Sequence, residues 1–252
     1  MSPDLAIHYA AFALPKRGNS ADEYEDAYRG DPLRGRFAIA DGASESSFAA
    51  EWARLLVDAF VDSAVAQPAP WLSWLPAIQQ RWQTALLGRE LPWYAQAKVD
   101  QGAFAAFLGV VLETQQSLGR TQQLWQAVAV GDSCFFQVRA GQMREAFPIK
   151  RACDFGNSPW LLGSRGSVDS NVEKRAVRSQ GDWVAGDRFW LMTDALAQWF
   201  LEEVEAGRKP WEALEPLLTD PQPQERFVGL VEGLRDAHAL RNDDVTLEAV
   251  GL

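Results

Sequence analysis

Three apolar stretches of the sequence each run directly into an aspartate that is followed by a small residue. These aspartates and their small neighbours are Asp41-Gly42, Asp132-Ser133 and Asp194-Ala195. A fourth acidic pair, Asp243-Asp244, stands instead at the start of an apolar stretch. One such aspartate is usually only a turn residue, because Asp-Gly and Gly-Asp commonly end strands. Their repetition indicates carboxylates that are collected at the ends of neighbouring strands.

The alternation of side chains along a strand predicts where these carboxylates point. Asp41 shares its parity with Phe37 and Ile39, and Asp132 shares its parity with Val130. Both acids therefore extend apolar rows that we expect to face inward. Unpaired buried carboxylates are costly, so a set that converges requires cations.

The two acids before the last strand differ in the same respect. Asp243 falls in the row of Val245 and Leu247, whereas Asp244 lines up with Thr246. Because neighbouring side chains of a strand point to opposite faces, only one of the two acids can enter a buried cluster. The pattern predicts that Asp243 is that acid.

The other candidate ligands are also oxygen atoms. Gly42 lacks a Cβ, so its backbone can approach closely and its carbonyl can serve as a ligand. Glu25 and Asp26 open the second predicted strand, although taken alone they are typical of a solvated charge pair. A ligand set of oxygen atoms without His or Cys favours Mg²⁺ or Mn²⁺ over Zn²⁺.

The overall charge and the absence of apolar runs exclude several classes of partner. Acidic residues outnumber basic ones by 34 to 24, and the basic residues form no run, so nucleic acid is not expected as a partner. No basic segment followed by an apolar stretch opens the sequence, and no apolar run is long enough to cross a bilayer. We expect a cytoplasmic protein without a membrane segment, in which Cys134 and Cys153 are reduced.

The elements that must position these residues follow one another without a linker long enough to separate two domains. We therefore expect one domain over residues 1–252. The predicted strands cover residues 5–14, 26–40, 102–113, 124–132, 134–139, 143–149, 188–193 and 243–250. The predicted helices cover residues 46–66, 71–87, 195–205, 210–218 and 224–237. Strands joined through short turns, with helices in separate blocks, predict antiparallel sheets covered by helices, which is an α+β fold.

Two segments allow more than one interpretation. Residues 150–185 lose the apolar pattern and are expected to form a long loop with at most one short strand, either functional or mobile. Of the 11 tryptophans, four lie in the segment from Trp71 to Trp93. These rings either pack helices against a sheet or present a surface that docks a partner.

Taken in order, these segments resemble the metal-dependent serine/threonine protein phosphatases of the PP2C (PPM) family, in particular its bacterial-type members. The matching motifs are Glu25-Asp26-Ala27, Asp41-Gly42, Gly131-Asp132-Ser133, Gly186-Asp187 with Thr193-Asp194, and Asp243-Asp244-Val245-Thr246. Each motif is weak alone, but together they keep the family's order from about residue 16 to the end of the chain.

The resemblance implies a four-layer α-β-β-α sandwich of two mainly antiparallel sheets flanked by helices. It also implies two Mn²⁺ or Mg²⁺ ions and a weaker third. Asp41 would bridge two ions, and the Gly42 carbonyl would complete one shell. Asp194 and Asp243 would hold one ion and, with Asp41, would form the catalytic set. By the same resemblance, Asp26 with Glu25 would anchor the water shell of the other ion, and Asp132 would serve the third ion together with Asp194.

The implied activity is hydrolysis of phosphoserine and phosphothreonine in proteins by a water that bridges the ions, opposed by a serine/threonine kinase. Two departures favour an alternative, a catalytically weak or inactive PP2C-like module that binds a partner. The family often has a general-acid histidine where this chain has Ala43, and a phosphate-holding arginine where it has Ala21. Lys16 or Arg17 would then hold the phosphate, and His238 is the other candidate acid.

Overall fold

The strands form two sheets in which every pairing is antiparallel. The structure is a computed structural model that describes residues 7–43, 48–63, 73–86, 101–117, 120–156, 158–166 and 170–252. The first sheet has the order β1 (His8–Leu14), β11 (Val245–Gly251), β10 (Arg188–Met192), β6 (Cys134–Arg139) and β7 (Gln142–Phe147). The second has the order β2 (Ala27–Asp31), β3 (Arg36–Gly42), β4 (Phe104–Ser117), β5 (Arg120–Val130) and β9 (Val177–Asp182), with β8 (Leu162–Gly163) paired to β4.

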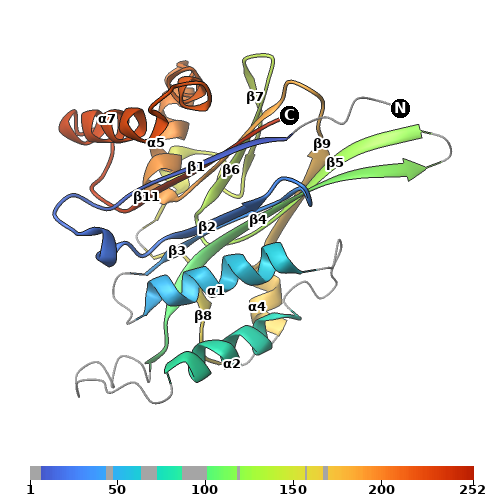
Figure 1. Cartoon of the computed structure of the whole chain (residues 1–252), viewed down its shortest axis with the longest axis vertical. Coiled ribbons are helices and arrows are strands. Elements are labelled where there is room, and N and C mark those ends of the chain that lie inside the picture. Colours follow the sequence, from blue (N-terminus) through green and yellow to red (C-terminus); the bar gives the residue numbers. More distant parts are fainter. Residues whose placement is uncertain are drawn as a thin grey trace.

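Helices cover the outer side of each sheet, as Figure 1 shows. The second sheet carries α1 (Ala49–Asp62) and α2 (Leu75–Leu86), and the first carries α5 (Asp194–Glu205), α6 (Trp211–Leu214) and α7 (Pro223–Asp236). The shorter helices are α4 (Ser170–Arg175) and the 3-10 turns η1 (Ala21–Glu23), η2 (Ala152–Asp154) and η3 (Glu215–Leu218). The predicted four-layer α-β-β-α sandwich is therefore confirmed.

The alternation of side chains along β3 explains why the two sheets stack. Phe37 and Ile39 are fully buried between the sheets, whereas Ala38 and Ala40 face α1. Small residues on the helix-facing row let α1 lie close to the sheet. Trp52 of α1 fills the remaining space, and its indole N–H donates to the carbonyl of Leu162 at 2.8 Å.

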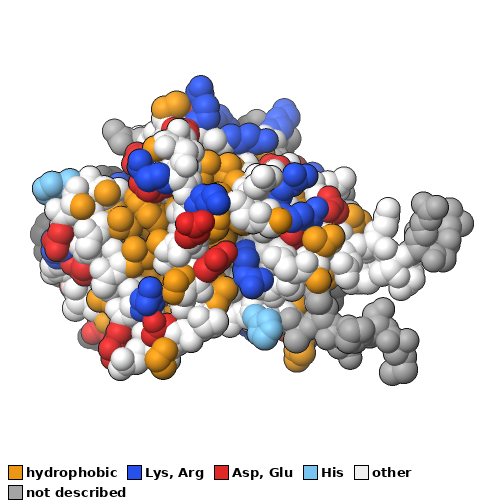
Figure 2. All heavy atoms as spheres, turned by 90° about the horizontal axis from the view of Figure 1, so that it is seen from above, with side chains coloured by type: hydrophobic (Ala, Val, Ile, Leu, Met, Phe, Trp, Pro, Cys, Tyr) orange, Lys and Arg blue, Asp and Glu red, His pale blue; other side chains and the backbone are white. Residues whose placement is uncertain are grey.

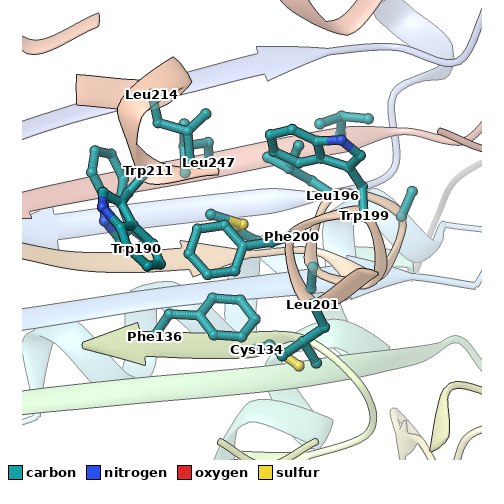
Figure 3. Packing of buried hydrophobic residues seen from close by; sticks show 14 of the residues in the cluster. Cys134, Phe136, Trp190, Leu196, Trp199, Phe200, Leu201, Trp211, Leu214 and Leu247 are labelled. Carbon is teal, nitrogen blue, oxygen red and sulfur yellow. The ribbon is translucent and has the colours of Figure 1, made fainter. Parts of the chain in front are cut away.

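Aromatic rings dominate the core between the first sheet and its helices (Figure 3). Phe200 of α5 stacks on Phe136 of β6 with ring centroids 4.3 Å apart, and the ring of Trp211 on α6 lies tilted against Phe200 with centroids 6.1 Å apart. Each of these side chains is almost completely buried. Burial of a ring of this size stabilises the fold by about 1.5–3 kcal/mol.

The stretch 26–40, expected to be one strand, is a hairpin. β2 and β3 are separate strands joined by the turn Pro32–Gly35, in which Gly35 has a φ of +63°. A Cβ on Gly35 would lie 2.6 Å from the carbonyl oxygen of Leu112, so only glycine fits there. The expectation of one strand was wrong because both arms of the hairpin favour the extended conformation and the turn between them is short.

The segment 150–185 contains more regular structure than the predicted loop. It includes β8, α4 and β9, and β9 forms the edge of the second sheet beside β5. The side chains of β9 are mostly exposed or half-buried polar groups, so the sequence has no alternating apolar pattern that would predict this strand. An edge strand with one open side is a position where such a sequence is tolerated.

Two of the four tryptophans in the segment from Trp71 to Trp93 lie in the described part of the chain, and both pack against the core. Trp82 of α2 is fully buried, and the ring of Trp74 meets that of Phe107 edge to face, with centroids 5.9 Å apart. For these two the packing interpretation applies. Trp71 and Trp93 lie outside the described residues.

No helix among the described residues is both long and apolar enough to cross a membrane. Within the same residues Cys134 is buried and Cys153 is exposed, and both are free cysteines. On the face seen in Figure 2, basic and acidic side chains lie beside one another near its centre.

A buried acid lies on β11 between the two sheets. Glu248 is fully buried, and the hydroxyl of Tyr9 donates to its Oε1 at 2.6 Å, while its Oε2 has no hydrogen-bond partner. Burial raises the pKa of Glu248 well above its usual range, and the hydrogen bond from Tyr9 opposes that shift only in part. Folding therefore favours the protonated acid.

This arrangement predicts a pH dependence of stability. Because the pKa of Glu248 is higher in the folded than in the unfolded chain, its contribution is fully present below the unfolded pKa of about 4.3 and is lost as the pH rises through the folded pKa. Glu248→Gln cannot ionise and keeps an acceptor for Tyr9. We expect the parent to lose stability relative to Glu248→Gln as the pH rises, measured by urea unfolding between about pH 5 and pH 9.

The exposed Glu212, whose side chain is 64% accessible, provides the matched control as Glu212→Gln. Its unfolding free energy should follow that of the parent at every pH. A constant difference between the parent and Glu248→Gln across the range would show that Glu248 does not take up a proton on folding.

Candidate metal centre

The register of the first sheet brings two of the predicted acids to one end. Leu14 pairs with Val245, and Met192 pairs with both Leu247 and Cys134, so these strand ends are level. Asp194 follows the end of β10, and Asp243 precedes the start of β11. Both acids therefore lie at the same end of the strands of the first sheet.

The other predicted acids lie at the corresponding strand ends of the second sheet. Asp41 pairs with Ala106 on β4, and the preceding pairing of Ala40 with Ala27 brings the start of β2 beside it. Asp26 directly precedes β2, and Asp132 follows the end of β5. We call the five predicted aspartate ligands the acidic cluster, and they are Asp26, Asp41, Asp132, Asp194 and Asp243.

Polar contacts join the two sheets at these strand ends. The hydroxyl of Thr246 on β11 donates to Oδ2 of Asp26 at 2.7 Å, and the hydroxyl of Tyr24 is hydrogen-bonded to the same threonine. The carboxylate of Asp244 accepts from the backbone N–H groups of Lys16 and Glu25, each at 2.8 Å. These contacts therefore hold the strand ends of the two sheets together.

Burial and mutual repulsion dominate the electrostatics of the acidic cluster. Burial raises the pKa of Asp41 well above its usual range, and the charges of Asp26, Asp132 and Asp243 raise it further. Burial also raises the pKa of Asp26, while hydroxyl hydrogen bonds from Thr246 and Thr193 oppose the shift. The charges of Asp26, Asp132 and Asp243 therefore make ionisation of Asp41 more costly, whereas a hydrogen bond with Asp41 lowers the pKa of Asp26.

Asp132 does not extend an inward-facing strand row as predicted. Val130 belongs to the core that faces α1, not to the core between the sheets, so the row that Asp132 was expected to extend faces the helices. Gly131, with a φ of +100°, turns the chain before Asp132. Asp132 is only 4% exposed, and burial raises its pKa, while the charge of Arg241 lowers it.

Asp194 is the first residue of α5, where the helix dipole favours a negative charge. Its Oδ1 accepts from the N–H of Ala195, and its Oδ2 forms an ion pair with Arg241. The Nε of Arg241 lies 3.4 Å from Oδ2 of Asp243. The guanidinium of Arg241 therefore joins two members of the cluster.

Sequence reasoning missed Arg241, Thr193 and the backbone contacts of Asp244. Nothing distinguishes Arg241 in the sequence, since a basic residue before a strand is ordinarily solvated. Thr193 and Thr246 stood in the matched motifs, but they act on Asp26 from 167 (193 − 26) and 220 positions further along the chain.

The two neighbouring acids do not follow the predicted alternation. β11 begins at Val245, so Asp243 precedes the strand and its side chain is 41% accessible, whereas Asp244 is 6% exposed. Thr246 faces the second sheet and Val245 faces the helices, so the row of Asp244 is the one that leads to Asp26. The parity argument for Asp243 is therefore wrong, and its role as a ligand has to rest on its charge beside Asp41.

The close backbone approach expected at Gly42 is present. A Cβ on Gly42 would lie 2.5 Å from the carbonyl oxygen of Glu25 and 3.0 Å from Cβ of Ala49. Glycine is required there because the loop before β2 lies directly against the end of β3. Glu25 itself is half-buried beside the cluster.

The candidate phosphate ligands lie in the loop after β1, next to the cluster. The backbone N–H of Lys16 is held by Asp244, as described above. The guanidinium of Arg17 forms ion pairs with Glu232 and Asp236 of α7, the latter at 2.8 Å. A phosphate at this position would have to compete with these two acids for Arg17.

The residues that bear on whether the site is catalytic all lie outside the strands. Ala43 follows β3, and Ala21 opens the turn η1. His238 has a φ of +54° in the loop after α7 and lines a pocket together with Arg241.

The donor atoms of the cluster fit a hard divalent cation. They are carboxylate and carbonyl oxygens, and the buried Oδ1 of Asp26 has no hydrogen-bond partner. In the part of the chain that the structure describes, no three acidic, histidine or cysteine side chains are grouped closely enough to hold an ion without rearrangement. The chemistry of the donors thus fits, while their present arrangement includes the guanidinium of Arg241.

The fold is that of the PP2C (PPM) serine/threonine protein phosphatases, as comparison with solved structures shows. PstP of Mycobacterium tuberculosis, a serine/threonine phosphatase, is 18% identical with a TM-score of 0.58 over 98% of each chain. PppA of Pseudomonas aeruginosa, a regulatory component of T6SS, is 18% identical with a TM-score of 0.57 over 97% of each chain. MsPP of Mycobacterium smegmatis is 20% identical with a TM-score of 0.52 over 98% of each chain.

One structure of the PstP catalytic domain contains two manganese ions. A chain from a bacterial stressosome study is also similar, at 19% identity and a TM-score of 0.52. No protein-family model matches the sequence, and no curated protein matches it.

Proposed function

We propose that this protein is a metal-dependent phosphatase that removes phosphate from phosphoserine and phosphothreonine in other proteins. The observation that carries the proposal is the convergence of four acids on one another. Burial of Asp41 and the charges of Asp26, Asp132 and Asp243 raise the pKa of Asp41. Like charges are brought together at a cost, and divalent cations would offset it. The shared fold with PP2C phosphatases supports the same conclusion.

We assign the metal-holding roles within this site as follows. Asp41 would contribute to both ions, Gly42 would offer its carbonyl, and Asp194 with Asp243 would complete one set. Asp26, supported by Glu25, would serve the other ion, and Asp132 a third. Bound Mn²⁺ or Mg²⁺ would lower the pKa of a water molecule and offset the charge that develops on the phosphoryl group.

The surrounding residues position these acids. Thr246 donates to Asp26 and fixes the direction of its carboxylate, and Asp244 fixes the backbone of Glu25. The backbone of Lys16 is attached to the same site through Asp244, and we propose that the side chains of Lys16 and Arg17 would hold a bound phosphate there. We expect the protein to act in the cytoplasm against a serine/threonine kinase.

A second candidate function is a PP2C-like module that binds a partner without efficient catalysis. It is favoured by the ion pairs of Arg241 with Asp194 and Asp243, and by Ala43 and Ala21 at positions where the family has catalytic side chains. The similar chain comes from work on the bacterial stressosome, a modular system adapted to control secondary messenger signalling.

Phosphate release from synthetic phosphopeptides separates the two candidates. With Mn²⁺ present, we expect release from phosphothreonine and phosphoserine peptides and far less from a phosphotyrosine peptide of the same sequence. Asp62→Asn, which alters an exposed acid on α1, should retain the full rate. No release from any of the peptides would favour the binding module.

A further inference from the structure

Arg241 lies where a cation is required. Its guanidinium pairs with Oδ2 of Asp194 and reaches Oδ2 of Asp243 at 3.4 Å. These are the two acids assigned above to one metal ion. An oxygen that carries a guanidinium ion pair offers little to a divalent cation, since both are attracted to the same lone pairs and the same charge.

The position of Arg241 allows it to leave these acids without unfolding. It belongs to the loop between α7 and β11, and 37% of its side chain is accessible. It also lines a pocket of about 500 Å³ beside α5, together with Gln198, His238 and Asn242. A long side chain can therefore move from the acids into this pocket while the backbone stays in place.

We propose that Arg241 is an internal counter-cation that competes with a metal ion for Asp194 and Asp243. The inference rests on the proposed function, because that function makes these acids metal ligands. In the metal-free protein the guanidinium offsets part of the repulsion within the acidic cluster. Metal binding must displace it, so the apparent affinity for the ion is reduced by the fraction of molecules in which Arg241 occupies the acids.

Competition of this kind predicts that removing Arg241 lowers the stability of the metal-free protein but raises its affinity for the metal ion. Without metal, its removal leaves carboxylates uncompensated and should lower the melting temperature. With metal, its removal should raise the affinity, by roughly fivefold or more, which corresponds to one partly buried ion pair. A residue that only supports the fold would lower both stability and affinity.

The test titrates metal-stripped protein with Mn²⁺ in a calorimeter and follows melting with and without Mn²⁺. Arg241→Gln is compared with the parent and with Arg34→Gln, which removes a positive charge from the β2–β3 turn at the far end of β3. We expect tighter Mn²⁺ binding, a lower melting temperature without metal and a larger rise on adding Mn²⁺ for Arg241→Gln alone.

Equal or weaker Mn²⁺ binding by Arg241→Gln, or no binding by either protein, overturns the inference. If Arg241→Gln fails to fold, Arg241→Lys keeps the charge but loses the planar fork, and its affinity should then exceed that of the parent; an affinity at or below that of the parent contradicts competition. The proposed function fails separately. Tighter binding by Arg241→Gln without phosphopeptide hydrolysis would uphold the competition and reject the phosphatase.

Discussion

Replacing Asp41 by asparagine should lower the rate of phosphomonoester hydrolysis by more than about a hundredfold and leave the fold intact. The charges of Asp26, Asp132 and Asp243 all raise the pKa of Asp41, so Asp41 lies close to three other acids of the cluster. Asparagine has nearly the same shape but no charge, so it removes an anionic ligand that two ions would share. In the metal-free protein the same change removes repulsion, and the melting temperature should stay equal or rise.

The measurement is kcat/KM for an aryl phosphate at saturating Mn²⁺, with melting followed by circular dichroism. Asp62→Asn on α1 is the matched control and should behave like the parent. Turnover by Asp41→Asn within a few-fold of the parent would mean that Asp41 only ends a strand.

The second large effect concerns the neighbouring acids Asp243 and Asp244. Their asparagine substitutions should change different properties, namely metal binding and turnover for Asp243 and stability for Asp244. Asp243→Asn should weaken Mn²⁺ binding and turnover by at least about tenfold, because its charge acts directly on Asp41. Asp244→Asn should instead lower the free energy of unfolding by about 1–3 kcal/mol, because its carboxylate accepts from the backbone N–H groups of Lys16 and Glu25. An amide has one acceptor oxygen and would turn its NH₂ group toward one of these donors.

Calorimetry with Mn²⁺ and urea unfolding distinguish the two variants. The account is contradicted if Asp244→Asn abolishes metal binding while Asp243→Asn leaves it unchanged. That result would make the more buried acid the ligand and would assign Asp243 to the solvated loop.

The order of strands and helices was enough to predict an α+β fold, and the resemblance to PP2C phosphatases implied the four-layer sandwich. The repeated pattern of apolar strand and terminal aspartate predicted carboxylates at the strand ends. It succeeded for β3, where Phe37 and Ile39 do face the other sheet and Asp41 follows in their row. It failed where alternation no longer applies. Gly131 turns the chain before Asp132, and β11 begins after Asp243.

What the sequence could not predict depends on contacts between distant segments. Thr246 and Asp26 are 220 positions apart and meet only because the two sheets stack. The same holds for Asp244 with Lys16 and Glu25. β9 escaped prediction for a local reason, since an edge strand with exposed polar side chains shows no apolar alternation.

Hydrolysis of an aryl phosphate by metal-stripped protein, before and after addition of Mn²⁺ or Mg²⁺, tests the central claim most directly. If the acidic cluster is a metal centre that performs phosphate hydrolysis, the stripped protein will be inactive, and either ion will restore turnover. Undiminished turnover after exhaustive treatment with a chelator would contradict the account.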